Sequence, residues 1–185
     1  MNAVITKRLI IRRPKKTDLQ NFLAYRNDAD NLKFQPIVKM TEEAALTLLA
    51  KQMFIDEKKE TGWVMFAIEL KNKKRMIGEV GIYISADGIS NGDLGWSIHK
   101  EDQGNGYALE AAEVLLAYAF KQRKLQQVTA TCVAVNTASV MLMKRLGMRR
   151  EMKRNQNQFI DGVRYDEHLY KISRDEWSML KITLP

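Results

Sequence analysis

Short runs of alternating apolar and polar residues recur along the chain, and segments with helical spacing separate them. Loose alternation predicts a strand at residues 5–12, and two apolar runs at 63–70 and 76–84 predict an antiparallel hairpin because a charged turn joins them. Gly78 and Gly81 in the second run indicate a bulge or a close approach of another backbone. The first half of the chain is therefore expected to supply the antiparallel part of a sheet.

Two helices are expected between the first strand and the hairpin. Thr17 and Gln20 form a candidate capping box for the first helix. Thr41 is a candidate N-cap for the second, and Glu42 and Glu43 place negative charge at the positive end of its dipole. Both segments carry an apolar stripe at helical spacing, which is typical of helices that pack on a sheet.

The second half of the chain alternates strands with helices. Strands are expected at 93–99, 128–135, 148–154 and 163–172, and helices at 107–122 and 138–146. Gly147 should end the second of these helices, and Ser173 with Glu176 offers a capping box for a last one. The order predicts one mixed α/β, α+β-like domain over residues 1–185, which is long enough for a single core.

The junction between strand 93–99 and helix 107–122 carries the candidate chemistry. It reads Gln103-Gly104-Asn105-Gly106-Tyr107-Ala108. Glycines ahead of a helix N-terminus leave backbone N–H groups available, and the helix dipole favours an anion there. Leu109 occupies the last glycine position of a dinucleotide fingerprint, and no Gly-Lys-Ser/Thr follows for a triphosphate loop. A glycine pair can also serve only to make the turn.

Three segments resemble the GNAT superfamily of N-acetyltransferases. The junction is similar to the acetyl-CoA motif (Gln or Arg)-x-x-Gly-x-(Gly or Ala), through Gln103, Gly106 and Ala108. Asn136-Thr137-Ala138-Ser139, followed by Leu146-Gly147-Met148, resembles the second cofactor segment of the family. The stretch 6–12, Thr-Lys-Arg-Leu-Ile-Ile-Arg, resembles the opening of the branch that includes ribosomal-protein N-terminal-alanine (RimJ/RimL-like) and spermidine acetyltransferases.

The resemblance implies a GNAT fold, with a central mixed, twisted sheet of six to seven strands flanked by helices. The sheet should splay between the fourth and fifth strands, here 93–99 and 128–135, and the pantetheine of acetyl-CoA should lie in the gap. The implied cofactor-binding residues are Ile98, His99, Gln103, Gly104, Asn105, Gly106, Tyr107, Ala108, Asn136, Ser139 and Lys144. No metal is expected, and a single cysteine cannot build a multi-thiolate zinc site.

The implied reaction is direct attack of a primary amine on acetyl-CoA in a ternary complex. Many family members protonate the departing thiolate with a Tyr at the position of Met143, so the general acid is open here. Ser139 is our candidate for a hydrogen bond to the thiol, with a helix-cap role as the alternative. Glu79 is the candidate base through a water molecule, with a solvated or salt-bridged strand carboxylate as the alternative.

The acceptor implied by the resemblance is a protein N-terminal amine of the ribosomal-protein kind. Thirty Lys and Arg against 22 Asp and Glu give a net charge of +8, which favours an anionic partner and disfavours a polyamine acceptor. A small-molecule amine such as a polyamine, amino acid or antibiotic stays open as the acceptor. A non-catalytic CoA- or RNA-binding domain of the same shape also stays open, although no base-stacking motif suggests direct nucleic-acid binding.

The expected setting is the cytoplasm. One cysteine, Cys132, excludes an intramolecular disulfide, and we recognise no signal peptide. Nowhere do roughly 18 apolar residues run uninterrupted, so no membrane span is expected. A monomer and a homodimer are both compatible with the sequence.

Overall fold

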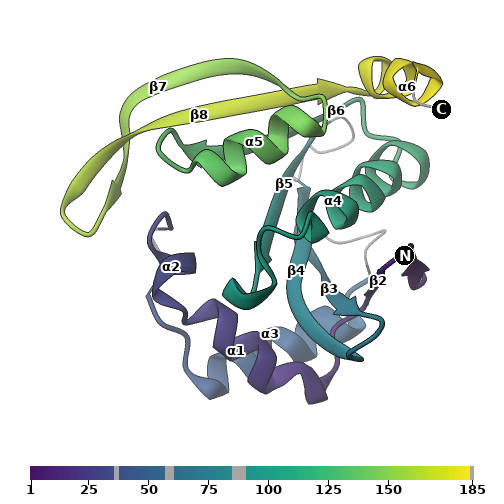
Figure 1. Cartoon of the computed structure of the whole chain (residues 1–185), viewed down its shortest axis with the longest axis vertical. Helices are drawn as coiled ribbons and strands as arrows, with labels where there is room; N and C mark the ends of the chain where they lie inside the picture. Colours follow the sequence, from purple (N-terminus) through teal and green to yellow (C-terminus); the bar gives the residue numbers. More distant parts are fainter. Residues whose placement is uncertain (36–37, 57–60, 85–90, 184–185) are drawn as a thin grey trace.

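The computed structural model describes residues 1–35, 38–56, 61–84 and 91–183, which form a mixed α/β fold around one sheet (Figure 1). Eight strands hydrogen-bond in the order β1-β2-β3-β4-β5-β6-β8-β7 within this described part. Their bounds are β1 Val4–Ile5, β2 Leu9–Arg12, β3 Gly62–Leu70, β4 Arg75–Ile84, β5 Asn91–Ile98, β6 Gln127–Val133, β7 Arg149–Ile160 and β8 Val163–Ser173. The expected six to seven strands become eight because the segment 5–12 turns back on itself and forms β1 and β2.

The sheet parts between β5 and β6. These two strands are parallel and pair only from Asn91 to Asp93 with Gln127 to Thr129, whereas every other pair of neighbours is antiparallel. Beyond Asp93 the strands diverge, so the predicted splay is confirmed. The splay lies between β5 and β6 rather than between the fourth and fifth strands, because β1 is an additional strand at the start of the chain.

Six α-helices flank the described sheet: α1 Leu19–Arg26, α2 Ala29–Leu32, α3 Glu42–Phe54, α4 Tyr107–Ala117, α5 Thr137–Arg145 and α6 Arg174–Thr183. The predicted N-caps are confirmed at Thr41, whose Oγ1 accepts from the Ala44 N–H at 3.2 Å, and at the Ser173–Glu176 capping box. Gly147 ends α5 with a φ of 79°. None of the helices in the described ranges is long and apolar enough to cross a bilayer.

The helix predicted over 107–122 is confirmed in its bounds, and its last turn after Ala117 is π-helical. Two other local predictions were wrong. The Thr17–Gln20 capping box does not form, because residues 16–18 make a 3₁₀ turn in which the Asp18 carboxylate accepts from the Lys15 N–H at 2.7 Å. The strand expected to end at residue 154 continues to residue 160, because β7 pairs with β8 up to their turn.

Helices cover both faces of the sheet, and β3 shows how the sequence pattern places them. Met65 and Ala67 pack with α1 and α3, in a cluster that includes Phe22 and Leu49. Phe66 points to the opposite face, where α4 contributes to the larger core cluster. Strand alternation therefore divides the apolar residues between two layers of helix. In Figure 1 the long β7–β8 hairpin arches away from these layers near α5.

Candidate active site

Two cavities lie where β5 and β6 part. The first, about 510 Å³, is bounded by the glycine loop before α4 and by α5, and we term it the loop cavity. The second, about 560 Å³, is bounded by the faces of β4, β5 and β6, and we term it the strand cavity. Residues that line both are Asn31, Phe34, Gln35, Trp96, Ser97, Asn136 and Ser139. The two cavities therefore meet at one place beside the splayed strands.

The glycine loop presents backbone donors to the loop cavity. Gly104 and Gly106 have φ values of 76° and 78°, a left-handed conformation that residues with a Cβ rarely adopt. The α4 helix begins directly afterwards, and the Glu110 N–H donates back to the Gly106 carbonyl at 3.2 Å. The N–H groups before Glu110 in this helix start have no intrahelical acceptor, and the positive end of the helix dipole lies behind them. This arrangement suits an anion.

An amide network joins the loop to α2 and to the end of β5. The Gln103 Nε2 donates to the Ile98 carbonyl at 3.0 Å and to the Asn31 Oδ1 at 2.9 Å. The Asn31 Nδ2 in turn donates to the carbonyls of Ile98, at 3.2 Å, and of Tyr25, at 2.8 Å. The Gln103 side-chain amide is therefore hydrogen-bonded within the protein. The same network holds α2 beside both cavities.

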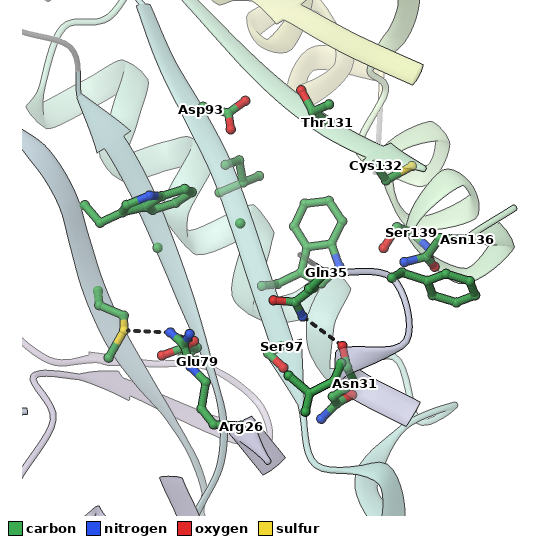
Figure 2. Close-up of a pocket in the computed structure, with 18 of the residues that line it drawn as sticks. Arg26, Asn31, Gln35, Glu79, Asp93, Ser97, Thr131, Cys132, Asn136 and Ser139 are labelled. Carbon is green, nitrogen blue, oxygen red and sulfur yellow. Dashed lines mark hydrogen bonds and ion pairs between the residues drawn. The ribbon is translucent and has the colours of Figure 1, made fainter. Parts of the chain in front are cut away.

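Aromatic and acidic side chains line the strand cavity (Figure 2). Its aromatic lining consists of Tyr25, Phe34, Trp63 and Trp96. Among the described residues its charged lining consists of Glu79, Asp93, Glu167 and Arg26. Two of the three carboxylates are paired, Glu79 with Arg26 and Glu167 with Arg154, and Asp93 is the one without a cationic partner among the described residues.

Glu79 lies on β4, opposite Ser97 of β5, and forms an ion pair with Arg26. Its side chain is only 9% exposed. Burial raises the pKa of Glu79 above its ordinary value, against the opposite effects of Arg26 and of the neighbouring Tyr25 hydroxyl. The sequence left open a general base or a salt-bridged carboxylate, and the structure shows the ion pair.

Residues 8–149 match the family described as Acetyltransferase (GNAT) domain. The chain belongs to the GNAT acetyltransferase family. It is 31% identical over 175 residues to YnaD of Bacillus subtilis, named an uncharacterized N-acetyltransferase, with 95% of this chain and 99% of that protein covered. The predicted family and its acetyltransferase activity are therefore confirmed.

Solved structures of GNAT proteins share the fold. A GNAT-family acetyltransferase from Bacillus anthracis superposes with a TM-score of 0.82 at 28% identity, covering 94% of this chain and 99% of that one. The ribosomal-protein-S5-alanine acetyltransferase from Vibrio fischeri superposes with a TM-score of 0.83 at 22% identity, covering 96% and 99%. The second protein carries the name of the branch that the sequence resembles.

Most residues that the GNAT resemblance assigns to the cofactor surround the loop cavity. They are Ile98, Gln103, Gly104, Gly106, Tyr107, Ala108, Asn136 and Ser139. Asn136 also caps α5, since its Oδ1 accepts from the Ser139 N–H at 3.1 Å. This cap leaves the Ser139 side chain at the place where the loop and strand cavities meet.

Three assigned residues lie elsewhere. The His99 Nδ1 accepts from the Glu101 N–H at 3.4 Å and so caps a 3₁₀ turn rather than lining the cavity. The Asn105 Nδ2 donates to two loop carbonyls, those of Asp102 and Gln103, and supports the loop from within. Lys144 borders a separate depression, and Arg145 faces the loop cavity in its place, because residues 138, 141, 142 and 145 share one side of α5.

Asp93 is a further carboxylate that the sequence did not single out. It is the last residue of β5 that pairs with β6, and its Oδ1 accepts from the Thr129 Oγ1 at 2.9 Å. Burial raises the pKa of Asp93 above its ordinary value, and the charge of Glu167 acts in the same direction. No sequence periodicity predicts a role for Asp93, because its position depends on the pairing of two strands that are distant in the sequence.

Met143 occupies the position where many GNAT proteins have a Tyr. Its side chain is fully buried in the main core cluster, and it lines neither cavity. A thioether also has no proton to give. Of the residues considered for this role, Ser139 is the one whose side chain reaches the junction of the cavities.

Proposed function

We propose that this GNAT protein transfers the acetyl group of acetyl-CoA to a primary amine by direct attack within a ternary complex. The observation that carries the proposal is the meeting of the two cavities at Trp96, Ser97, Asn136 and Ser139. One cavity ends at an anion-binding loop, and the other is a separate chamber with acidic and aromatic walls. Two substrates entering from these sides would place thioester and amine in contact, which is the main requirement of a direct transfer.

The cofactor fits the loop cavity in its chemistry. The N–H groups of Gly104, Gly106, Tyr107 and Ala108 would bind the pyrophosphate. The edge of β5 from Leu94 to Ile98 lies beyond the last β6 pairing. The Ile98 carbonyl already accepts hydrogen bonds from Asn31 and Gln103, so other backbone groups of this edge would meet the pantetheine amides. Both features follow from the chain itself: the glycines permit the loop, and the divergence of β6 exposes the edge.

The transfer needs a proton acceptor and a proton donor. The amine lone pair attacks the thioester carbonyl, the carbon–sulfur bond breaks, and the thiolate takes up a proton. Glu79 would accept the amine proton through a water molecule, and its raised pKa moves it toward the range useful for a base at neutral pH. The Ser139 hydroxyl would donate a hydrogen bond to the departing thiolate.

The acceptor that we propose is a protein N-terminal amine of the ribosomal-protein kind. The Thr-x-Arg-Leu opening and the name of the Vibrio fischeri neighbour support this class. A net charge of +8 would also favour association with an anionic assembly such as a ribosome.

The acidic strand cavity supports a second acceptor class, a small amine that carries a further positive charge. Net charge disfavoured such an acceptor, but a ligand inside a cavity responds chiefly to the charges that line it, since distant surface charges are screened by salt. Of the carboxylates that line the cavity, Glu79 and Glu167 are paired with Arg26 and Arg154, and Asp93 is the one that a cationic ligand could pair with. The two classes share the amine chemistry and differ in what surrounds the amine.

Calorimetry with acetyl-CoA and with NAD tests the cofactor first. We expect micromolar binding of acetyl-CoA and none of NAD. Gly106→Trp should abolish binding, because a side chain disfavours this left-handed backbone and would push against Arg8, whose Nη2 lies 3.5 Å from the Cβ position. Gly162→Trp is the matched control. Gly162 also has positive φ, 81° against 78°, and open space around its Cβ position, but it lies in the β7–β8 turn. Equal affinity for wild type and Gly106→Trp would remove the phosphate-loop assignment.

CoA release then tests the acceptor. Peptides with free N-termini, the same peptides with blocked N-termini, and spermidine separate the two classes. Release with free peptides alone supports the protein N-terminal amine, and release with spermidine alone supports the small cationic amine. Tight acetyl-CoA binding without release across the panel would instead favour a non-catalytic CoA-binding domain.

A further inference from the structure

The N-terminal segment lies against the phosphate-binding loop, although about a hundred residues separate them in the sequence. The Arg8 Nη1 donates to the Asn105 carbonyl at 2.8 Å. The Arg8 Nε and backbone N–H donate to the two carboxylate oxygens of Glu110, at 2.7 Å and 3.0 Å. The guanidinium also lies 4.6 Å from the centre of the Tyr107 ring. Arg8 therefore contacts the loop on both sides of Gly106.

The contact with Asn105 fixes the direction of one cofactor-facing donor. In a trans peptide the carbonyl and the following N–H point in opposite directions, and the described chain contains no cis peptide. Because Arg8 holds the Asn105 carbonyl, the Gly106 N–H points away from Arg8. Gly106 lines the loop cavity, whereas Arg8 does not. The Arg8 guanidinium thus lies on the side of the loop away from the loop cavity and orients the Gly106 N–H on the side that faces the cavity.

The neighbouring peptide is held in the same way. The Asn105 Nδ2 donates to the Gln103 carbonyl at 3.0 Å, so the Gly104 N–H points away from that amide. The left-handed conformation of both glycines makes these peptides easy to rotate in the absence of such contacts, because glycine populates many backbone conformations. Tying the carbonyls behind the loop removes that freedom before the ligand arrives.

The contact with Glu110 has an electrostatic consequence. Glu110 lies in the first turn of α4, at the helix end that would bind the phosphates. Burial raises the pKa of Glu110, but the hydrogen bonds from Thr6 and Arg8 outweigh burial and hold this pKa below its ordinary value. The side chain is therefore a carboxylate at neutral pH, and it would repel a nearby phosphate. The Arg8 charge balances it at 2.7 Å.

We propose that Arg8 is a positioning residue for cofactor binding, which orients the Gly106 N–H toward the pyrophosphate and neutralises Glu110 beside it. The proposal rests on the proposed use of acetyl-CoA. It gives a physical role to the Thr-x-Arg opening of the chain, whose Thr6 also donates to Glu110. Arg8 touches no substrate atom and acts through the loop.

Arg8→Ala tests the proposal, and Lys7→Ala is its matched control. Lys7 is the exposed neighbour of Arg8, so both variants lose one positive charge from the same segment. Calorimetry measures the affinity for acetyl-CoA, and ligand-observed NMR measures that for S-acetylpantetheine, which carries the thioester without the pyrophosphate. We expect Arg8→Ala to weaken acetyl-CoA binding at least tenfold and to leave S-acetylpantetheine unchanged. Lys7→Ala should change neither by more than twofold.

The outcomes separate this proposal from the proposed function. Absence of acetyl-CoA binding by the wild type would overturn the proposed cofactor itself. Wild-type binding with an Arg8→Ala affinity within twofold would overturn the positioning role alone. An equal loss for acetyl-CoA and S-acetylpantetheine would also overturn it, because a general loosening of the fold affects both ligands and a pyrophosphate-specific effect only one.

Discussion

Gly78 of β4 is a position where an added Cβ atom would collide with the backbone of the neighbouring strand, and Gly78→Ala tests the consequence. A Cβ atom built at Gly78 would lie 2.2 Å from the Ser97 carbonyl oxygen and 2.9 Å from the Ile98 Cα, whereas real Cβ atoms do not approach within 3.0 Å. Both of these clashing atoms belong to the backbone, so no side-chain rotamer change can relieve the clash. The β5 strand must move by close to an ångström.

That movement falls on the strand that borders both cavities. Adding one methyl group to a packed interior costs about 1–3 kcal/mol, and for a chain of this length each kcal/mol lowers Tm by roughly 2–4 °C. We therefore expect a fall in Tm of about 2–12 °C. A displacement near 1 Å at a reacting centre costs on the order of a hundredfold in rate. Calorimetric melting and CoA release measure the two effects.

Gly81→Ala on the same strand is the graded control. Its Cβ would lie 3.2 Å from the Val64 carbonyl oxygen and 3.3 Å from the Trp63 ring, so shifts of a few tenths of an ångström suffice. We expect a smaller loss of stability and of rate than at Gly78. If Gly78→Ala melts and turns over like Gly81→Ala, the close approach of β4 and β5 does not constrain the site.

Three further predictions concern charge and burial. Arg12→Ala leaves the carboxylates of Asp18 and Glu69 buried without their shared cation, at 2.8 Å and 2.6 Å in the native structure, so urea unfolding should show a loss of about 3–5 kcal/mol; a loss below 1 kcal/mol would contradict this. Because hydrogen bonds hold the pKa of Glu110 below its ordinary value of 4.5, its stabilisation is present above pH 4.5 and is lost as pH falls through the lowered pKa. The Tm gap between wild type and Glu110→Gln should therefore narrow as pH falls below 4.5. A gap that stays constant with pH would refute the linkage. Partial burial raises the pKa of Cys132 to about 11, so this thiol should react with disulfide reagents at pH 8 about a hundredfold more slowly than free cysteine. Reaction at the rate of free cysteine would disprove the raised pKa.

The features that the sequence predicts correctly depend on neighbours in the chain. The caps at Thr41 and Ser173 and the αL stop at Gly147 are each satisfied within about four residues, so short patterns reveal them. The Thr17–Gln20 box failed because a different local turn forms, in which the Asp18 carboxylate accepts from the Lys15 N–H and residues 16–18 are already in the 3₁₀ helix.

The missed features join distant segments. Asn31 reaches a carbonyl 67 residues away, and Arg8 reaches a carboxylate 102 residues away, so neither leaves a periodic signal. Asp93 becomes notable only because β6 leaves it at the point of divergence. Lys144 and Arg145 differ by one residue, which on a helix is a rotation of about 100° and decides whether a side chain faces the cavity. A sequence pattern that does not fix the rotation of the helix about its axis cannot predict which of the two side chains faces the cavity.

The short pairing of β5 with β6 divides the sheet into two blocks. In the described part of the sheet, three residue pairs join β5 to β6, against seven in each adjacent ladder, β4–β5 and β6–β8. A ligand lying along the exposed edge of β5 would contact both blocks of the sheet. Its binding free energy would therefore add to the free energy of unfolding. The divergence of β5 and β6 that makes room for the substrate is thus also the place where the ligand-free protein should unfold locally first. In hydrogen exchange, residues 127–183 should then exchange together as one cooperative unit.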